Sequence, residues 1–278
     1  MSIFEKLIKV DRRIIFILIF VGVAIPMFFV LGFSIEITDD VKKVYDMVEE
    51  TPEGTTILVA FDYDPSTKPE LQPMADAVIE HALEKNLKLI CVALWPMGVQ
   101  MCAEVFEKMT ELYPDIKYGE NYVNMGYKAG GIVTINHMAK DFRGTFPTDE
   151  GSTPIDELPI LNGINNLEKI GFIFALSAGD PGIKQWVQVA HDAYGRPVAG
   201  GTTAVQAPMI LPYVNEQKQL IGLLGGLKGA AEYEKLIHHP AFATKGMDAQ
   251  SIAHLIIILL IILGNIGYFV TKKSKQTA

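Results

Sequence analysis

The sequence predicts an α/β protein: a Rossmann-like, doubly wound, mostly parallel sheet, flanked by one N-terminal and one C-terminal transmembrane helix. The sheet is predicted by short apolar runs rich in β-branched residues, which alternate with amphipathic helical segments. The membrane helices are predicted because residues 14–33 and 252–270 contain no Asp, Glu, Lys or Arg. The chain has 278 residues, 49% of them hydrophobic, and two cysteines, which excludes disordered, collagen-like and disulfide-stapled proteins.

The first apolar run, residues 14–33, has the length of a bilayer span. Twenty helical residues cover about 30 Å, the thickness of the hydrocarbon core. Pro26 predicts a kink, which transmembrane helices tolerate. The run is longer than the apolar region of a signal peptide and no Ala-x-Ala site follows it, so we expect a retained anchor. Before it, residues 1–13 are expected to form a cytoplasmic segment with an apolar helical face in the membrane interface.

The second apolar run predicts a transmembrane helix over residues 251–270, followed by a basic cytoplasmic tail over 271–278. His254 is the only titratable group within 252–270. It lies near one end, where interfacial water can hydrate it. We interpret it as an interfacial histidine, and the alternative is an intramembrane proton or metal site.

The distribution of charge predicts the orientation. Seven basic residues lie on the terminal sides of the two spans: Lys6, Lys9, Arg12, Arg13, Lys272, Lys273 and Lys275. The chain between them keeps 17 basic and 30 acidic residues, a formal charge of −13. Because basic flanks stay on the cytoplasmic side, we expect cytoplasmic termini and an extracytoplasmic domain over residues 34–250. An acidic domain without a basic stripe gains little from phosphate contacts, so nucleic acid is not an expected partner.

Within this domain, apolar runs predict strands at 56–61, 87–94, 116–118, 170–176 and 197–199. Helical spacing predicts helices near 71–83, 99–109 and 182–194, with further helical segments up to His238. Thr67 and Glu70 have the spacing of a capping box at the start of the first helix. Residues 122–166 are rich in Gly and Pro, and we expect an insertion with one helix near 132–142.

Polar residues follow three of the expected strands. In open α/β sheets, ligands bind beyond the carboxyl ends of the strands, where the chain order reverses. The candidate site residues are Asp62, Asp64, Ser177, Asp180, Thr202 and Thr203. Asp62 and Asp64 are suited to a divalent cation, or to a nucleophile beside an acid/base. Alternatively, Asp64 only shapes a loop and helps to cap the next helix.

The Asp-x-Asp of residues 62–64, directly after an apolar strand, resembles the first motif of the haloacid dehalogenase-like phosphohydrolases. The resemblance implies a nucleophilic Asp62 and an acid/base Asp64. It also implies a phosphate-binding Ser177 and a magnesium ligand at Asp180. The sequence departs from that family at Pro65, which directly follows the second aspartate.

Several other segments allow two interpretations each. Gly200 to Thr203 would present N–H groups and hydroxyls to an anion, or form a tight turn between strand and helix. The glycines of residues 222–229 lack a dinucleotide-binding spacing and indicate close packing, within the domain or between subunits. Cys91 and Cys102 are either two buried thiols or a disulfide, and sequence does not decide between them.

Three functions remain as hypotheses. The leading one is a membrane-tethered, non-catalytic α/β domain that serves as a structural or scaffold component of a membrane protein assembly. Its expected partners are the lipid bilayer and either further copies of the chain or other membrane proteins. The alternatives are a domain that senses or binds a small anionic ligand, and a metal-dependent phosphohydrolase that uses Asp62 and Asp64. The sequence specifies no cofactor.

Overall fold

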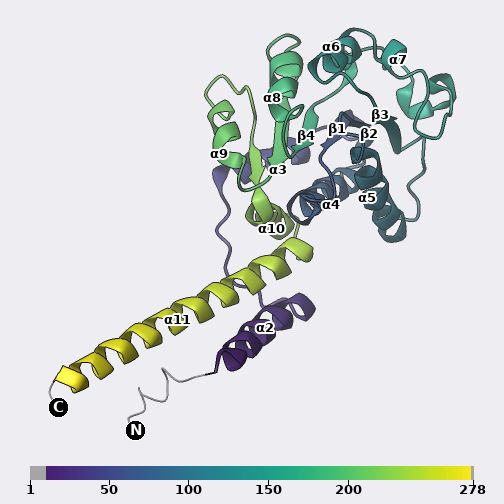
Figure 1. Ribbon diagram of the computed structural model, residues 1–278. Helices are drawn as coiled ribbons and strands as arrows, with labels where there is room; N and C mark the ends of the chain where they lie inside the picture. The colour runs from purple at the N-terminus through teal and green to yellow at the C-terminus, as the bar shows by residue number, and fades with distance from the viewer. Residues whose placement is uncertain (1–10, 277–278) are drawn as a thin grey trace. The chain divides into compact units, whose positions relative to one another are not determined.

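A computed structural model describes residues 11–276 of the chain (Figure 1). The chain divides into two compact units: a domain of residues Ile35–Ala243, and a unit made of Met1–Ser34 and Thr244–Ala278. The interfacial helix expected before residue 11 lies outside the described residues. The segment boundaries expected from the sequence, at 34 and 250 for the domain, stay predictions.

The domain is built on a six-stranded sheet in which every strand pairs in parallel. The strands are β1 (Thr56–Asp62), β2 (Lys88–Ala93), β3 (Tyr122–Tyr127), β4 (Ile173–Ser177), β5 (Val198–Thr202) and β6 (Leu223–Gly225). Their order, β3-β2-β1-β4-β5-β6, is the strand order of a Rossmann sheet. The predicted α/β fold is therefore confirmed, and the chain order reverses between β1 and β4.

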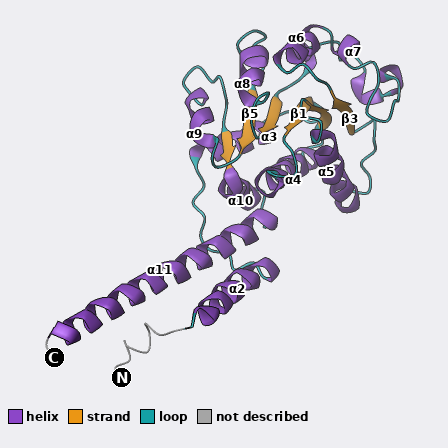
Figure 2. Ribbon diagram, in the orientation of Figure 1, coloured by secondary structure: helices purple, strands orange, loops and turns teal. Residues whose placement is uncertain are grey.

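Helices cover both faces of the sheet (Figure 2). One face carries α3 (Asp39–Glu49), α4 (Lys68–Glu84), α5 (Gly98–Leu112) and α10 (Gly226–Leu236). The other carries α6 (Ile132–Lys140), α7 (Phe142–Thr145) and α8 (Ile183–Trp186), which continues as a π-helical segment, Val187–His191. A short α9 (Ala207–Ile210) follows β5. Because both faces are covered, the strands are apolar at successive positions, and β1 is buried from Ile57 to Asp62.

The third strand lies at 122–127 and not at 116–118, so the earlier prediction for it was wrong. Tyr118 forms only an isolated bridge, to Tyr122. The strand was missed because Asn124 and Gly126 are types that strands disfavour. The fold accommodates Asn124 because its Oδ1 accepts from Gly126 N at 3.0 Å and its Nδ2 donates to Val99 O at 3.3 Å. The stretch 122–166 therefore begins with an edge strand rather than as an insertion.

Of two local predictions, the capping box fails and the close packing of the glycines is confirmed. The capping box at Thr67 does not form, since its side chain makes no cap hydrogen bond. Glu70 instead accepts from Ala204 N at 2.8 Å, which links the start of α4 to the loop after β5. The glycines near 222–229 span β6 and the start of α10, and they pack closely within the domain. A Cβ at Gly222, for example, would lie 2.3 Å from Asp40 O on α3.

The second unit contains α2 (Arg12–Phe28) and α11, which begins in the domain and runs from Phe242 to Gln276. By length and composition, α11 is suited to cross a membrane over Phe242–Val270, and the mean hydropathy of its most apolar 18 residues is 2.4. The expected N-terminal span is not shown, because α2 is 17 residues long and ends at Phe28, two residues after Pro26. Residues 29–33 continue without helical structure.

Contacts inside this unit join the segment after α2 to α11. Asp248 is 1% exposed and accepts backbone N–H groups from Leu31 at 2.9 Å, Gly32 at 3.0 Å and Phe33 at 3.2 Å. One carboxylate thereby satisfies three consecutive donors of a non-helical segment. Further along, Gly22 lies so near α11 that a Cβ there would meet Ile256 Cδ1 at 2.5 Å.

Candidate functional site

Three of the residues singled out from the sequence are neighbours across the carboxyl ends of three strands. Asp62 pairs with Ser177, and Ser177 pairs with Thr202, in the parallel register of β1, β4 and β5. β1 and β4 flank the point where the chain order reverses, the usual ligand position in sheets of this type. The parallel topology thus brings Asp62, Ser177 and Thr202 together.

Asp62 is fully buried and both of its carboxylate oxygens are occupied. Oδ1 accepts from Leu94 N and Oδ2 from Trp186 Nε1, each at 2.8 Å. Burial raises the pKa of Asp62 to about 7, and the hydrogen bonds from Trp186 and Leu94 oppose that rise. The carboxylate therefore joins the end of β1 to the loop after β2 and to α8.

The hydroxyls of Ser177 and Thr202 are also used within the fold. Ser177 Oγ donates to Gly179 O at 2.8 Å, and Thr202 Oγ1 donates to Ser177 O at 2.7 Å. Thr203 O accepts from both Gln206 N and Ala207 N at 3.0 Å. These contacts match the interpretation of a tight turn between β5 and α9, with its polar groups paired locally.

Asp64 and Asp180 lie on loops around this position. Asp64 Oδ1 accepts from Ser66 N at 2.9 Å and from Ser66 Oγ at 2.6 Å, the pattern of an Asx turn. Asp180 is exposed, and its Oδ1 accepts from Gln185 Nε2 at 3.3 Å. No group of three His, Cys, Asp or Glu in the described part of the chain is placed to hold a metal ion. The catalytic and metal roles of these residues stay predictions.

Trp95, from the loop after β2, covers the position where the strand order reverses. Its Nε1 donates to Pro181 O at 2.9 Å. Its six-membered ring lies against Gly179, where a Cβ would be 3.1 Å from Trp95 Cζ2. Gln206, from the loop after β5, donates to Ala178 O. Side chains from neighbouring loops thus occupy the crevice that holds the ligand in nucleotide-binding sheets.

Exposed apolar side chains lie at the same edge of the sheet as this crevice. We call the following residues the carboxyl rim: Met97, Ile132, Val133, Val205, Met209 and Leu211. They make up six of the ten exposed large hydrophobic residues of Ile35–Ala243, and all follow the carboxyl ends of β2, β3 and β5. Val205 is 84% exposed and Val133 is 68% exposed. Apolar side chains gathered in this way mark an interaction surface more often than scattered ones do.

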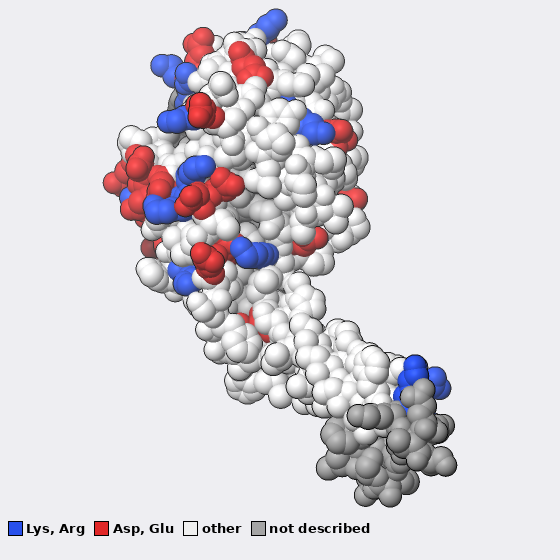
Figure 3. Space-filling view, turned by 90° about the vertical axis from the view of Figure 1, so that its left-hand side faces the viewer, with Lys and Arg blue, Asp and Glu red and all other residues white. Residues whose placement is uncertain are grey.

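The segments that carry the carboxyl rim contain no charged residue. Residues 89–103, 129–139 and 197–215 have no Asp, Glu, Lys or Arg, although the chain between the terminal basic clusters has a formal charge of −13. The side of the domain that bears α9 faces the viewer in Figure 3, and a broad area there lacks charged side chains. The 19 uncharged residues of 197–215 were the sequence signal for this surface, which sequence reasoning missed.

A second polar arrangement, on α10, holds the segment through which the chain enters the domain. Glu232 is 1% exposed, and its Oε2 accepts from both Thr38 N and Thr38 Oγ1 at 2.7 Å. Its Oε1 accepts from Lys228 at 2.5 Å. Lys235 donates to Ile35 O at 2.7 Å. α10 therefore fixes residues 35–38 through side chains of both charges.

The same helix holds the segment through which the chain leaves. Glu234 is 2% exposed and accepts from Ala241 N and Ala243 N, each at 2.9 Å. We call Glu232, Glu234 and Lys235 the α10 clasp. It supplies partners for backbone groups of both connecting segments, which lack a regular ladder to satisfy them.

The two cysteines are both buried and free. They lie on β2 and α5, and burial raises the pKa of the Cys102 thiol well above its ordinary value, with Cys91 as a neighbour. A thiol in this environment stays protonated and unreactive.

The chain matches no protein-family model, and neither the curated proteins nor the solved structures gave a significant match. The fold and the side-chain geometry are therefore the features that indicate its function.

Proposed function

We propose that this protein is a membrane-tethered, non-catalytic α/β domain that serves as a structural component of a membrane assembly and associates with further copies of itself through the carboxyl rim. The observation that carries the proposal is the gathering of exposed, uncharged apolar side chains after β2, β3 and β5. The chain contributes no covering for these side chains within the domain, and burial against a partner would stabilise them.

In this proposal the chain crosses the membrane twice. α11 supplies the candidate span Phe242–Val270, and we assign a second crossing to residues 14–33, of which α2 forms the first part. Phe16 and Phe20 on α2 are more than 60% exposed, a favourable state in lipid and an unfavourable one in water. With basic residues outside both crossings, the termini are cytoplasmic and the domain extracytoplasmic.

A second copy is the partner that the charge pattern favours. Two acidic domains repel each other across most of their surfaces, and an uncharged patch lets them approach without that cost. Tethering to one membrane also keeps the copies in a shared plane, which raises their effective concentration. A twofold contact, in which the same patch serves both subunits, is the commonest arrangement of such oligomers.

The geometry supports catalysis less well. Nucleophilic attack or metal binding needs a carboxylate oxygen that a substrate or ion can reach, whereas both oxygens of Asp62 are buried and hydrogen-bonded. An anion site at β4 and β5 would likewise need the hydroxyls of Ser177 and Thr202, which donate to backbone carbonyls. The phosphohydrolase and anion-binding hypotheses therefore rank below assembly.

The test is cross-linking in intact membranes of the full chain carrying Val205→Cys. The native cysteines are buried, so a short bismaleimide reacts with the introduced thiol. We expect a product of twice the mass of the 30.7 kDa chain. Leu112→Cys, at an exposed apolar position at the far end of α5, is the matched control and should give no such product.

Three results would overturn the proposal. Absence of any product at Val205→Cys, under conditions where a monofunctional maleimide labels it, would remove the carboxyl rim as an interface. A product of another mass would assign the rim to a different protein. Equal yields of dimer from Val205→Cys and Leu112→Cys would mean that the cross-links form by random collision and not at a specific interface.

A further inference from the structure

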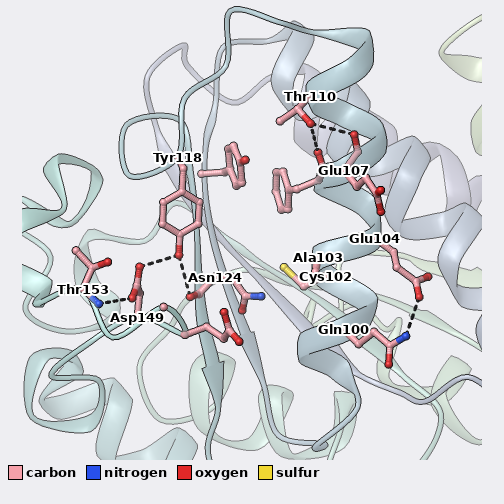
Figure 4. A pocket seen from close by; sticks show the side chains of 14 residues that line it. Gln100, Cys102, Ala103, Glu104, Glu107, Thr110, Tyr118, Asn124, Asp149 and Thr153 are labelled. Carbon is pink, nitrogen blue, oxygen red and sulfur yellow. Dashed lines mark hydrogen bonds between the residues drawn. The ribbon is translucent and has the colours of Figure 1, made fainter.

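A cavity of about 540 Å³ opens beside the edge strand β3, between α5 and residues 149–153 (Figure 4). Its volume lies within the range of small-molecule sites, about 300 to 1,000 Å³. None of the carboxyl rim residues lines it, so it is separate from the surface assigned to assembly.

The walls of the cavity include three aromatic rings. Phe106 on α5 and Tyr122 on β3 stack with centroids 4.0 Å apart and planes 4° from parallel. Tyr118 meets Tyr122 edge-on, with centroids 5.4 Å apart. Tyr118 is fixed in this position because its hydroxyl donates to Asp149 Oδ2 at 2.8 Å. The rings are thus held in place before any ligand arrives, and their faces attract cations.

The charged groups of the cavity are all acidic. Four lining residues carry carboxylates, and none of the lining residues is Lys, Arg or His. Asp149 accepts from Tyr118 and Thr153, and Glu104 pairs with Lys68.

The remaining two carboxylates, of Glu107 on α5 and Glu150 on the opposite wall, have no partner among the side chains that the structure describes. The site therefore has carboxylates on both walls available to a cation.

The geometry of the cavity indicates whether a metal ion or an organic cation fits it. The described His, Cys, Asp and Glu include no group of three placed to hold a metal ion, so the carboxylates here are too dispersed to coordinate one. The aromatic walls offer apolar contact that a bare ion cannot use. We propose that this cavity binds a small organic cation, an alkylammonium whose hydrocarbon part lies against Tyr118 and Tyr122 and whose ammonium groups pair with Glu107 and Glu150.

The test uses the full chain in detergent and three ligands that each contain five carbon atoms. 1,5-Diaminopentane is the cationic probe, while 1,5-pentanediol and pentanoate are its neutral and anionic counterparts. Titration calorimetry should detect binding of the diamine, and at least tenfold weaker binding of the other two. Glu107→Gln and Glu150→Gln each remove one charge at an exposed position, and each should weaken binding of the diamine about tenfold.

Glu216→Gln is the matched control, because it removes one exposed carboxylate that does not line this cavity. It should leave the dissociation constant within twofold of the original. Equal binding of the diol, unchanged binding by both Glu107→Gln and Glu150→Gln, or an equal loss with Glu216→Gln would each overturn the proposal. These measurements do not involve the carboxyl rim, so their failure is distinguishable from failure of the assembly proposal.

Discussion

The α10 clasp and the carboxyl rim differ in whether their side chains find partners within the chain. In the clasp, Glu232 and Glu234 are buried charges, and each accepts two backbone or side-chain donors from the connecting segments. At the rim, Val205 and Met209 are apolar side chains that stay exposed. The clasp is therefore complete within one chain, whereas in the proposed assembly the rim is completed only by a partner.

The two regions should therefore respond to substitution in opposite ways. A change in the clasp leaves donors of the connecting segments without their acceptor, so its cost appears in the stability of the single chain. A change in the rim removes nothing that the single chain uses, so its cost appears only in association. Measurements of stability and of oligomeric state on the same variants separate the two.

The largest expected effect is on the clasp. Glu232→Ala leaves Thr38 N and Oγ1 without their acceptor, and we expect a loss of about 2–4 kcal/mol in the free energy of unfolding. Denaturant titration of the detergent-solubilised chain measures it. Glu232→Gln keeps one acceptor and should lose less. A Glu232→Ala variant as stable as the original would show that the clasp does not stabilise the single chain.

An intermediate effect is expected at Asp62, a carboxyl group whose two oxygens both accept hydrogen bonds. Asp62→Asn can accept only one of the two hydrogen bonds, which costs about 1–3 kcal/mol. Because native Asp62 keeps its proton up to about pH 7 and the unfolded chain releases it near 3.8, its stabilisation is complete below pH 4. That stabilisation is lost as the pH rises through 7.

The measurement is the difference in apparent Tm between the original chain and Asp62→Asn, taken from pH 5 to pH 8. We expect the difference to narrow as the pH rises. A difference that stays constant over this interval would mean that burial does not raise the pKa of this carboxyl as described.

The smallest effect on stability is expected at the rim. Val205→Lys should change the free energy of unfolding by less than about 0.5 kcal/mol, because the side chain is 84% exposed. The same variant should weaken self-association at least tenfold, since a buried lysine would face its own copy. Analytical ultracentrifugation in detergent measures this, with Leu112→Lys as the control. A Val205→Lys chain that is less stable but associates as strongly as the original would contradict this prediction.

The strand pattern could be predicted where local composition and structure agree. The apolar runs of 56–61 and 170–176 became β1 and β4, and their parallel pairing followed from the helices between them. The prediction failed at β3, where Asn124 is accommodated by bonds to Gly126 and Val99 that only the fold supplies. It also missed β6, since three residues are too few for a periodic signal.

The positions of the candidate site residues could be predicted better than their hydrogen-bond partners. Asp62 was singled out correctly as a polar residue at a strand end, yet its two donors come from residues 32 and 124 positions away. Such distant partners decide whether a carboxylate is reactive or structural, and no local pattern carries that information. For the same reason the cavity beside β3, formed by α5 and residues 149–153, left no trace in the sequence.

The indole of Trp95 gives the fold one further property. A single side chain fills the slot between the loops after β2 and β4, and its ring edge rests on a residue without a side chain, Gly179. Trp95 is partly buried, so Trp95→Gly would leave an apolar gap that opens to solvent on one side, and apolar gaps accept free aromatic molecules of matching size. Added indole would then restore the lost stability, so the scaffold is one substitution away from an engineered chemical switch.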